Sequence, residues 1–256
     1  MQSSPPFSAQ QVRQMLDWVA RTPALLQIGD TALLPAPGQI DLAALGQQLA
    51  ATARLGRRFE LLVAALLSGS GRYQILAQDC QITAQGRTLG APDLIVRDLR
   101  CGEIEHWELT VKFYLGLASG WLGPGKRDWL EQKAAHLKTR QLPLLARPEA
   151  QAWLATKGWQ PARSRLCSRG ILFGDGPSYP WLAPGHQQGQ WFEAGKLPDG
   201  DWRALARWQW IATTPSSELA AFTGQCQAPI MVQDGRSGLR HMVVPAGWPN
   251  NEKGEP

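Results

Sequence analysis

The clearest pattern along the chain lies at residues 105–115 (EHWELTVKFYL), where apolar and polar side chains alternate. Because successive side chains of a β-strand point to opposite faces of a sheet, a period of two predicts a strand with one apolar face. A shorter apolar stretch at residues 91–97 (APDLIVR) predicts a second strand. The turn-forming pair Cys101–Gly102 lies between them, so the sequence predicts that the two strands form a hairpin.

Helical and shorter extended patterns fill the rest of the chain. Apolar positions at helical spacing predict helices over residues 9–20, 41–68 (in two pieces divided near Leu55–Gly56), 126–139, 150–156 and 202–210. Short apolar runs predict strands at residues 73–77, 81–84 and 170–173, and at 229–233 and 239–244 around a DGRSG loop. From residue 57 to 173 the predicted order is helix, three antiparallel strands, helix, strand, which indicates an α/β core with helices covering a small mixed sheet.

The predicted elements divide the chain into three parts. Residues 1–53 form an N-terminal helical segment, residues 54–175 form the α/β core, and residues 176–256 form a Trp-, Gly- and Pro-rich extension of strands and loops that packs on the core. A chain of 256 residues with 44% hydrophobic and 18% charged residues can bury a substantial core, which excludes wholesale disorder.

The sequence lacks the features of membrane and exported proteins. No apolar run is long enough to cross a bilayer, the longest being Leu61 to Leu67. The stretch from Met1 to Gln11 is mostly polar, without a basic start and a following apolar run, so we expect no secretory signal. The four cysteines lie far apart without a CxxC pair, which argues against a zinc ribbon and a disulfide scaffold. We therefore expect a cytoplasmic protein with no membrane partner.

Positive charge is concentrated in one segment. The formal net charge is +5, and residues 121–170 contribute +7 through ten Lys or Arg and three acids, so the remainder sums to −2. A basic segment on a near-neutral chain indicates a phosphate-rich partner such as DNA or RNA, with Lys126, Arg127 and Lys133 as candidate contacts. The alternative is a solvated helix face.

Two carboxylates fall opposite each other in the predicted hairpin. If the hairpin turns around Arg100–Cys101, residues whose numbers sum to 201 are paired, and Asp93 and Glu108 meet that condition. Directly opposed side chains share a face with Cβ atoms about 4.5–5.5 Å apart, so the two carboxylates would repel each other unless a divalent cation lies between them. The alternative is that Asp93 caps a turn after Pro92 and that Glu108 pairs with Lys112.

Lys112 and Glu60 are further candidates for the same site. Lys112 lies four residues after Glu108 on the same strand face, where an ammonium group could stabilise an attacking hydroxide or the charge on phosphorus; the alternative is a surface lysine. Glu60 lies inside an apolar helix between the small residues Gly56 and Ala64, which would let that face approach a sheet. The alternative is a pair between Glu60 and an arginine of its own helix, Arg57 or Arg58.

Four segments carry a resemblance to a known family: LGRRFE (55–60), GRTLGAPDLIVRD (86–98), HWELTVKFYLG (106–116) and GPGKRDWLEQKAAHLKTRQL (123–142). They resemble an uncharacterised bacterial family, a domain of unknown function, which is similar to the PD-(D/E)XK (restriction-endonuclease-like) nuclease superfamily. The resemblance implies a restriction-endonuclease-like core. It also implies that Asp93 (after Pro92), Glu108 and the carbonyl of Leu109 bind magnesium or manganese, with Glu60 as the assisting acid of the preceding helix.

One departure from the superfamily pattern concerns its lysine, which follows the strand acid by two residues, where this chain has Thr110. Lys112 would be a displaced substitute, or the lysine would come from the next helix, as Lys126 or Lys133; otherwise hydrolysis has been lost. The first hypothesis is therefore a magnesium-dependent phosphodiesterase acting on nucleic acid. The second is an inactive nuclease fold that serves as a nucleic-acid-binding or protein-interaction module, and the third is a binding protein that uses the Trp-rich C-terminal region.

Other enzyme motifs are missing from the sequence. It has neither a GxxxxGK[ST] phosphate-binding loop nor a dinucleotide fingerprint in a strand–helix context, and its four histidines form no HExxH arrangement.

Overall fold

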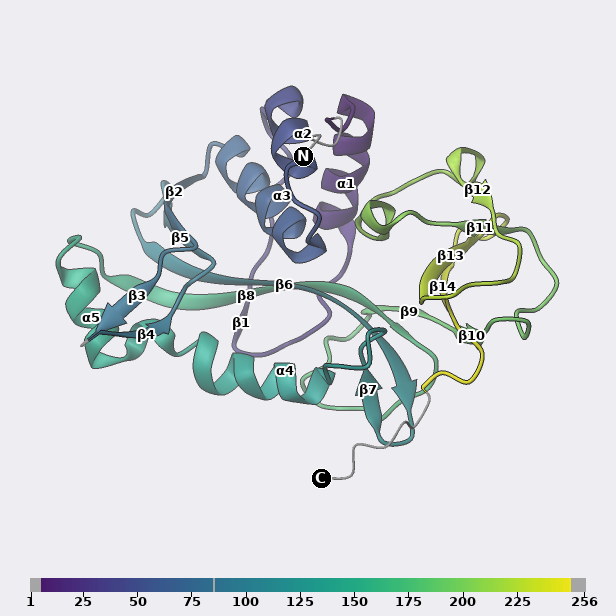
Figure 1. Cartoon of the computed structure of the whole chain (residues 1–256). Coiled ribbons are helices and arrows are strands. Elements are labelled where there is room, and N and C mark those ends of the chain that lie inside the picture. The colour runs from purple at the N-terminus through teal and green to yellow at the C-terminus, as the bar shows by residue number, and fades with distance from the viewer. Residues whose placement is uncertain (1–5, 85, 250–256) are drawn as a thin grey trace.

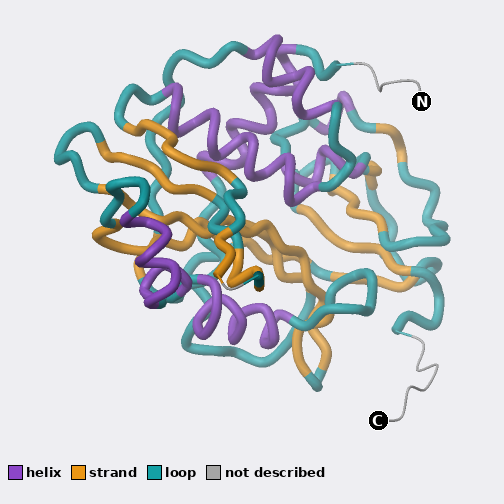
Figure 2. The backbone as a smooth tube through the Cα atoms, turned by 60° about the vertical axis from the view of Figure 1, so that its left-hand side comes forward, coloured by secondary structure: helices purple, strands orange, loops and turns teal. Residues whose placement is uncertain are grey.

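The computed structural model describes residues 6–84 and 86–249, which fold into layers of helices on the two faces of a mixed sheet (Figure 1). One face is covered by α1 (Ala9–Arg21), α2 (Leu42–Ala50) and α3 (Leu55–Gly69). The other is covered by α4 (Leu130–His136), and the strands lie between these two groups of helices in Figure 2. The predicted α/β class is confirmed.

The main sheet has seven strands. Five follow one another in the order β1 (Asp30–Thr31), β8 (Pro161–Phe173), β6 (Ile104–Leu117), β5 (Leu94–Asp98) and β2 (Tyr73–Gln78). The other two are β7 (Gly120–Leu122), which pairs with β6, and β9 (Gln187–Gly189), which pairs with β8. Strands β2, β5 and β6 are antiparallel, and β8 runs parallel to β6. The predicted order of helix, three antiparallel strands, helix and strand therefore holds from α3 to β8.

Strand β6 has two different faces, as its alternation predicts. Its odd-numbered residues Trp107, Leu109, Phe113 and Leu115 are buried with the apolar side chains of α1 and α3. Its even-numbered Tyr114 is buried with residues of α4 on the opposite face. The remaining even positions, from His106 to Lys112, carry polar groups under α4 and the helical segment that follows, η1 (Leu137–Gln141). This polar face contains the candidate site.

The three N-terminal helices are defined by their caps and their apolar stripes. Ser8 begins α1 with a capping box to Gln11, and the Asp41 carboxylate accepts hydrogen bonds from two backbone N–H groups at the start of α2. In α3, buried residues recur at helical spacing: Phe59, Leu62, Val63, Leu66 and Leu67. The predicted division of residues 41–68 is confirmed, with the break at residues 51–54.

A smaller sheet lies beside the main one and is built from the C-terminal part of the chain (Figure 1). Its order is β10 (Trp191–Glu193), β14 (Arg240–Val244), β13 (Ile230–Asp234), β11 (Trp202–Ala204) and β12 (Ala220–Ala221). The predicted hairpin is confirmed, because β13 and β14 pair in antiparallel fashion around the DGRSG loop. The remaining elements are β3 (Ile82–Ala84), β4 (Arg87–Gly90), η2 (Leu144–Ala146), α5 (Pro148–Ala155), η3 (Arg207–Ile211) and η4 (Ser216–Glu218).

Three predicted elements were wrong in extent or type. The helix expected over 126–139 begins only at Leu130, because Lys126 has a left-handed φ of 60° in a turn and cannot continue a helix. The strand expected over 170–173 is the end of the long β8, whose polar first half hides its extended character. The helix expected over 202–210 is β11 followed by the 3₁₀ turn η3.

Within the described ranges 6–84 and 86–249, none of the helices combines the length and the apolar character that a bilayer crossing requires.

Candidate functional site

Asp93 and Glu108 face each other at the point where β5 begins. Paired residues of β5 and β6 have numbers that sum to 201, as in Leu94 with Trp107 and Ile95 with His106, so the predicted register is confirmed. Asp93 directly precedes β5, and the same register places it opposite Glu108. Its carboxylate oxygen Oδ2 accepts a 2.7 Å hydrogen bond from the backbone N–H of Leu109, which holds it against β6 instead of in a turn cap.

The backbone of Leu109 faces the same edge of β6 as Asp93. In an extended strand the N–H and C=O of one residue point to the same side, so the Leu109 carbonyl also points away from β8. Strand β5 pairs with β6 only as far as Trp107, and no β5 residue covers β6 beyond that point. The Leu109 carbonyl is therefore directed toward an uncovered strand edge beside two carboxylates.

The two carboxylates are crowded in a buried place. Burial is the largest of the effects that raise the pKa of Asp93 to about 8; the neighbouring charges of Glu108 and, to a smaller extent, Glu60 act in the same direction, and the Leu109 N–H and Lys133 oppose them. Glu108 is only 1% exposed. A divalent cation would remove the repulsion, since carboxylate and carbonyl oxygens are ligands that magnesium and manganese prefer.

Lys133 is the cation that acts on both carboxylates. Burial lowers the pKa of Lys133, and Lys112 lowers it further, while Glu108 and Asp93 oppose this change. Its Nζ donates a hydrogen bond to Oε1 of Gln141, whose Nε2 donates to Oε2 of Glu108 over 2.6 Å. Lys133 is therefore half-buried inside the candidate site, and its predicted contact with nucleic acid stays a prediction.

Gln141 is a site residue that the sequence reasoning missed. In a regular α-helix, residues eight apart differ in direction by about 80°, so Lys133 and Gln141 would not point the same way. The π-helical segment η1 contains the bond from Leu142 N to Leu137 O, which widens the helix and brings Gln141 under Lys133. Such segments often occur at functional sites. The spacing of the two residues in QKAAHLKTRQ gives no signal of this contact, because it depends on the π-helical turn.

The second oxygen of Glu108 is also occupied. Its Oε1 lies 2.9 Å from Nε2 of the fully buried His106, whose Nδ1 lies 3.0 Å from the hydroxyl of Ser164. This chain of hydrogen bonds fixes the Glu108 carboxylate from the β8 side.

Lys112 neither pairs with Glu108 nor stands free on the surface, because its partner is Asp128. Its Nζ lies 3.0 Å from Oδ2 of Asp128, which also accepts a 2.9 Å hydrogen bond from the hydroxyl of Tyr114. Asp128 was not singled out in the sequence. The arrangement places the ammonium group at the open edge of β6, where 29% of the Lys112 side chain is exposed.

Glu60 lies on the other side of this edge. Its carboxylate forms a 2.9 Å ion pair with Arg57, as the alternative for this residue predicted, and Arg57 also contacts Asp79. Burial raises the pKa of Glu60, and the hydrogen bond from Arg57 opposes the change. The charges of Asp79 and Glu108 act in the same direction as burial, so Glu60 belongs to the same electrostatic group as the paired carboxylates.

A cavity of about 640 Å³ runs along this open strand edge. Its wall includes the segment of β6 from Leu109 to Phe113, together with Glu60 of α3 and Asp128. Two arginines, Arg54 and Arg207, also line it, and the guanidinium of Arg207 lies 3.8 Å from the ring centroid of Trp210. Lys126 and Arg127 are exposed in the loop next to this wall. Cationic groups therefore line a cavity whose wall includes Leu109, the neighbour of Glu108, but neither Asp93 nor Glu108 themselves.

The donor set fits a divalent metal only with the help of the backbone. Among the residues that the structure describes, no three His, Cys, Asp or Glu side chains gather closely enough to hold an ion by themselves. Asp93, Glu108 and the Leu109 carbonyl would supply three oxygen ligands, and water molecules would complete the shell of magnesium.

A family model described as a domain of unknown function (DUF1853) matches residues 1–244. The chain belongs to this family. The match covers almost the whole sequence and confirms the predicted membership of an uncharacterised family. No curated protein and no solved structure matches the chain. The similarity to PD-(D/E)XK nucleases, and the roles of Asp93, Glu108, Lys112 and Glu60, stay predictions.

Proposed function

We propose that the protein is a metal-dependent phosphodiesterase that cleaves nucleic acid. The observation that carries the proposal is the position of Asp93, opposite Glu108 and bonded to the Leu109 N–H at an uncovered strand edge. A buried and a half-buried carboxylate so placed destabilise the fold in the absence of a cation, and such an arrangement is more typical of a functional site than of a structural one.

Magnesium or manganese would be held by Asp93, Glu108 and the carbonyl of Leu109. When bound, the metal supplies a Lewis acid for the phosphate and lowers the pKa of water. The His106–Glu108 hydrogen bond orients one ligand, and the Leu109 N–H orients the other. Entry of the metal requires that Glu108 exchange its bond with Gln141 for the cation.

The two lysines have separate roles in this proposal. Lys133 lies beside the carboxylates, where burial lowers its pKa, so it suits the task of orienting or deprotonating the attacking water. Lys112 lines the cavity further along β6 and suits the stabilisation of charge on the phosphate. Thr110, at the position of the lysine in the superfamily pattern, lies between Glu108 and Lys112 on β6.

The cavity supports a polyanionic substrate. Arg54, Lys112 and Arg207 line it, and Lys126 and Arg127 extend the positive charge onto the neighbouring loop. A nucleic-acid backbone could follow this path and bring a phosphodiester group to the carboxylates.

The experiment is a cleavage assay of the full chain on single-stranded and duplex DNA and RNA, with magnesium, manganese or chelator. We expect metal-dependent cleavage that falls by roughly 10²- to 10⁴-fold in Asp93→Asn and Glu108→Gln. The exposed carboxylates Asp199 and Glu149 provide matched controls, and Asp199→Asn and Glu149→Gln should cleave like the wild type. Cleavage that persists in both site variants would place the chemistry elsewhere.

The hydrogen bonding of the Glu108 carboxylate favours a second candidate function, an inactive binding module. Both of its carboxylate oxygens are already hydrogen-bonded, to His106 and Gln141, and the superfamily lysine is replaced by Thr110. A protein of this kind would bind nucleic acid through Lys126 and Arg127 without metal and without cleavage. Salt-dependent binding that is insensitive to chelator, in the absence of any product, would favour it.

A further inference from the structure

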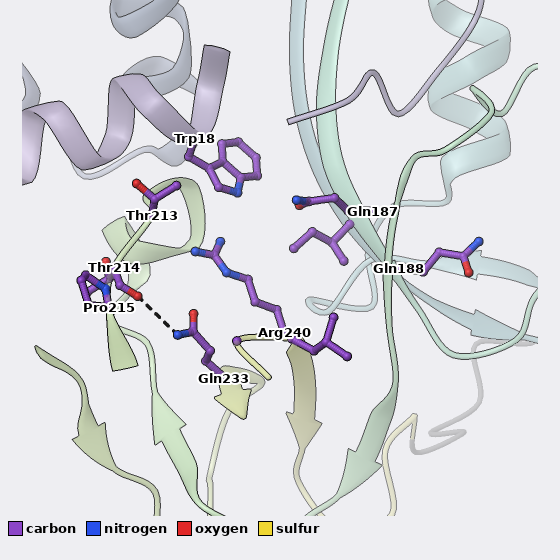
Figure 3. Close-up of a pocket in the computed structure, with 11 residues that line it drawn as sticks. Trp18, Gln187, Gln188, Thr213, Thr214, Pro215, Gln233 and Arg240 are labelled. Carbon is purple, nitrogen blue, oxygen red and sulfur yellow. Dashed lines mark hydrogen bonds between the residues drawn. The ribbon is translucent and has the colours of Figure 1, made fainter. Parts of the chain in front are cut away.

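A second cavity, of about 610 Å³, lies between the main sheet and the C-terminal sheet, far from the paired carboxylates in sequence (Figure 3). Trp18 of α1 and Gln187 of β9 line one side of it, and Thr214 and Gln233 line the other. Arg240, the first residue of β14, projects into the space between them in Figure 3. The volume is within the range of small-molecule sites, about 300–1,000 Å³.

The cavity contains a cation without a counter-ion. The guanidinium of Arg240 donates to the backbone carbonyls of Trp210 and Ala212, which are neutral. No Asp or Glu lines the cavity, and none of the ion pairs among the described residues involves Arg240. Burial lowers the pKa of Arg240 to about 10, so the group still carries its charge at neutral pH. A buried charge is costly unless it is paired.

Three other polar groups in the cavity wall lack partners. The indole Nε1 of Trp18, the hydroxyl of Thr214 and the amide oxygen of Gln187 are buried, and none forms a hydrogen bond. Most buried polar groups in proteins are hydrogen-bonded, so three unsatisfied groups around one space indicate that something polar occupies it. They come from α1, β9 and the segment after η3, which are far apart in the sequence.

We propose that this cavity binds a small organic anion, with its carboxylate or phosphate group against Arg240 and its apolar part against the remaining wall. Arg240 keeps three of its five N–H groups for the ligand, because its two carbonyl contacts use the other two. Trp18 Nε1 and the Thr214 hydroxyl add neutral donors, and the Gln187 oxygen accepts a hydrogen bond from the ligand. Ile171, Pro215 and Leu239 supply apolar surface.

A structural role for Arg240 explains its two carbonyl contacts but not the other features of the cavity. Holding Trp210 and Ala212 requires neither an absence of acids around the guanidinium nor three unpaired groups among the residues that line one cavity. An anion satisfies the charge and the unpaired groups together, and the site is distinct from the proposed metal centre.

The test uses two anions and a neutral control ligand. Benzoate carries a carboxylate on an apolar ring, inorganic phosphate carries the other oxyanion, and benzamide has the shape of benzoate without its charge. Calorimetric titration of the full chain should show binding of benzoate or phosphate at millimolar concentration or below, and no binding of benzamide. Benzoate without phosphate would identify a carboxylate site, and the reverse a phosphate site. Absence of both, or equal binding of benzamide, would overturn the proposal.

Two variants separate binding from folding. Thr214→Val removes an unpaired hydroxyl at constant shape, so it should not lower the melting temperature, but it should weaken the bound anion by roughly tenfold, the effect of a hydrogen bond to a charged group. Gln187→Glu adds a carboxylate to the cavity, so it should raise the melting temperature and abolish anion binding. Unchanged affinity in both variants would contradict the site. Asp93→Asn, at the proposed metal site, should bind the anion as the wild type does.

Discussion

Asp93 accepts a hydrogen bond of 2.7 Å from the backbone N–H of Leu109, one residue beyond its opposite partner Glu108. This bond fixes the Asp93 carboxylate at the strand edge although Glu108 repels it. The carbonyl of Leu109 points to the same edge of β6 as its N–H group. The candidate metal site therefore depends on backbone geometry as much as on acidic side chains.

The crowding of the two carboxylates predicts an unusual dependence of stability on pH. In the metal-free protein the pKa of Asp93 lies at about 8, above its ordinary 3.8, so the folded state binds a proton that the unfolded state has lost. The free energy of unfolding should therefore be highest below pH 4 for this group and should fall as the pH rises toward 8. Urea unfolding with chelator, at a series of pH values, measures this.

Asp93→Asn provides the comparison for that measurement. This substitution should remove most of the decline in the free energy of unfolding between pH 4 and pH 8. The variant should be more stable than the wild type at pH 8, because its amide does not ionise. Asp199→Asn, at an exposed position, should follow the wild type. If the wild type and Asp93→Asn have parallel pH profiles, the two carboxylates are not crowded.

The two lysines should differ in kinetic effect. Lys133→Ala should lower kcat, by roughly 10²-fold or more, since a positioned acid–base group acts mainly in the transition state. Lys112→Ala removes a phosphate contact and releases Asp128, and we expect it to raise KM as well as to lower kcat. Steady-state cleavage rates of both variants distinguish the role of Lys133 from that of Lys112. Equal kcat values in Lys133→Ala and the wild type would assign the task of orienting or deprotonating water to Lys112 instead.

The basic loop beside the cavity predicts salt-dependent binding. Lys126 and Arg127 are exposed there, so replacing both by Ala should weaken binding to nucleic acid at low salt and flatten the plot of log affinity against log salt concentration. The slope should decrease by about 1 for each lost phosphate contact. Lys157→Ala, an exposed site of the same basic segment near α5, is the control for charge alone. An equal effect of Lys157→Ala would show that the loop has no special role.

A substitution at Gly170 tests the packing of the sheet behind the site. It pairs with Lys112 in the register of β8 and β6, and a Cβ atom there would lie 1.8 Å from the Lys112 carbonyl oxygen. Its φ of 153° also favours glycine. Gly170→Ala should lower the free energy of unfolding by about 2–4 kcal/mol. Gly56→Ala in α3 meets no atom within 4 Å and should raise it by up to about 1 kcal/mol. Chemical denaturation measures both changes.

The sequence predicted the part of the site that depends on local pattern. Alternation at residues 105–115 identified β6, and the assumption of a turn around Arg100–Cys101 gave the register that places Asp93 opposite Glu108. The hairpin of β13 and β14 was equally local, because its loop and its apolar runs are adjacent in the chain.

The parts that depend on distant partners could not be predicted. The first half of β8 is rich in Arg and Ser, and it is a strand because its charges meet β6, as when Arg165 contacts Glu105 over 2.8 Å. The role of Gln141 depends on a π-helical turn that follows α4, and helical periodicity alone does not reveal it. The cavity around Arg240 joins α1 to the C-terminal sheet, more than two hundred residues apart.

The most direct test of the central claim is a calorimetric titration of manganese into metal-stripped protein. Wild type should bind manganese and gain thermal stability by mass action, and Asp93→Asn and Glu108→Gln should lose both effects while remaining folded. Well-folded wild type that binds neither manganese nor magnesium, or variants that bind as tightly as the wild type, would contradict the metal site.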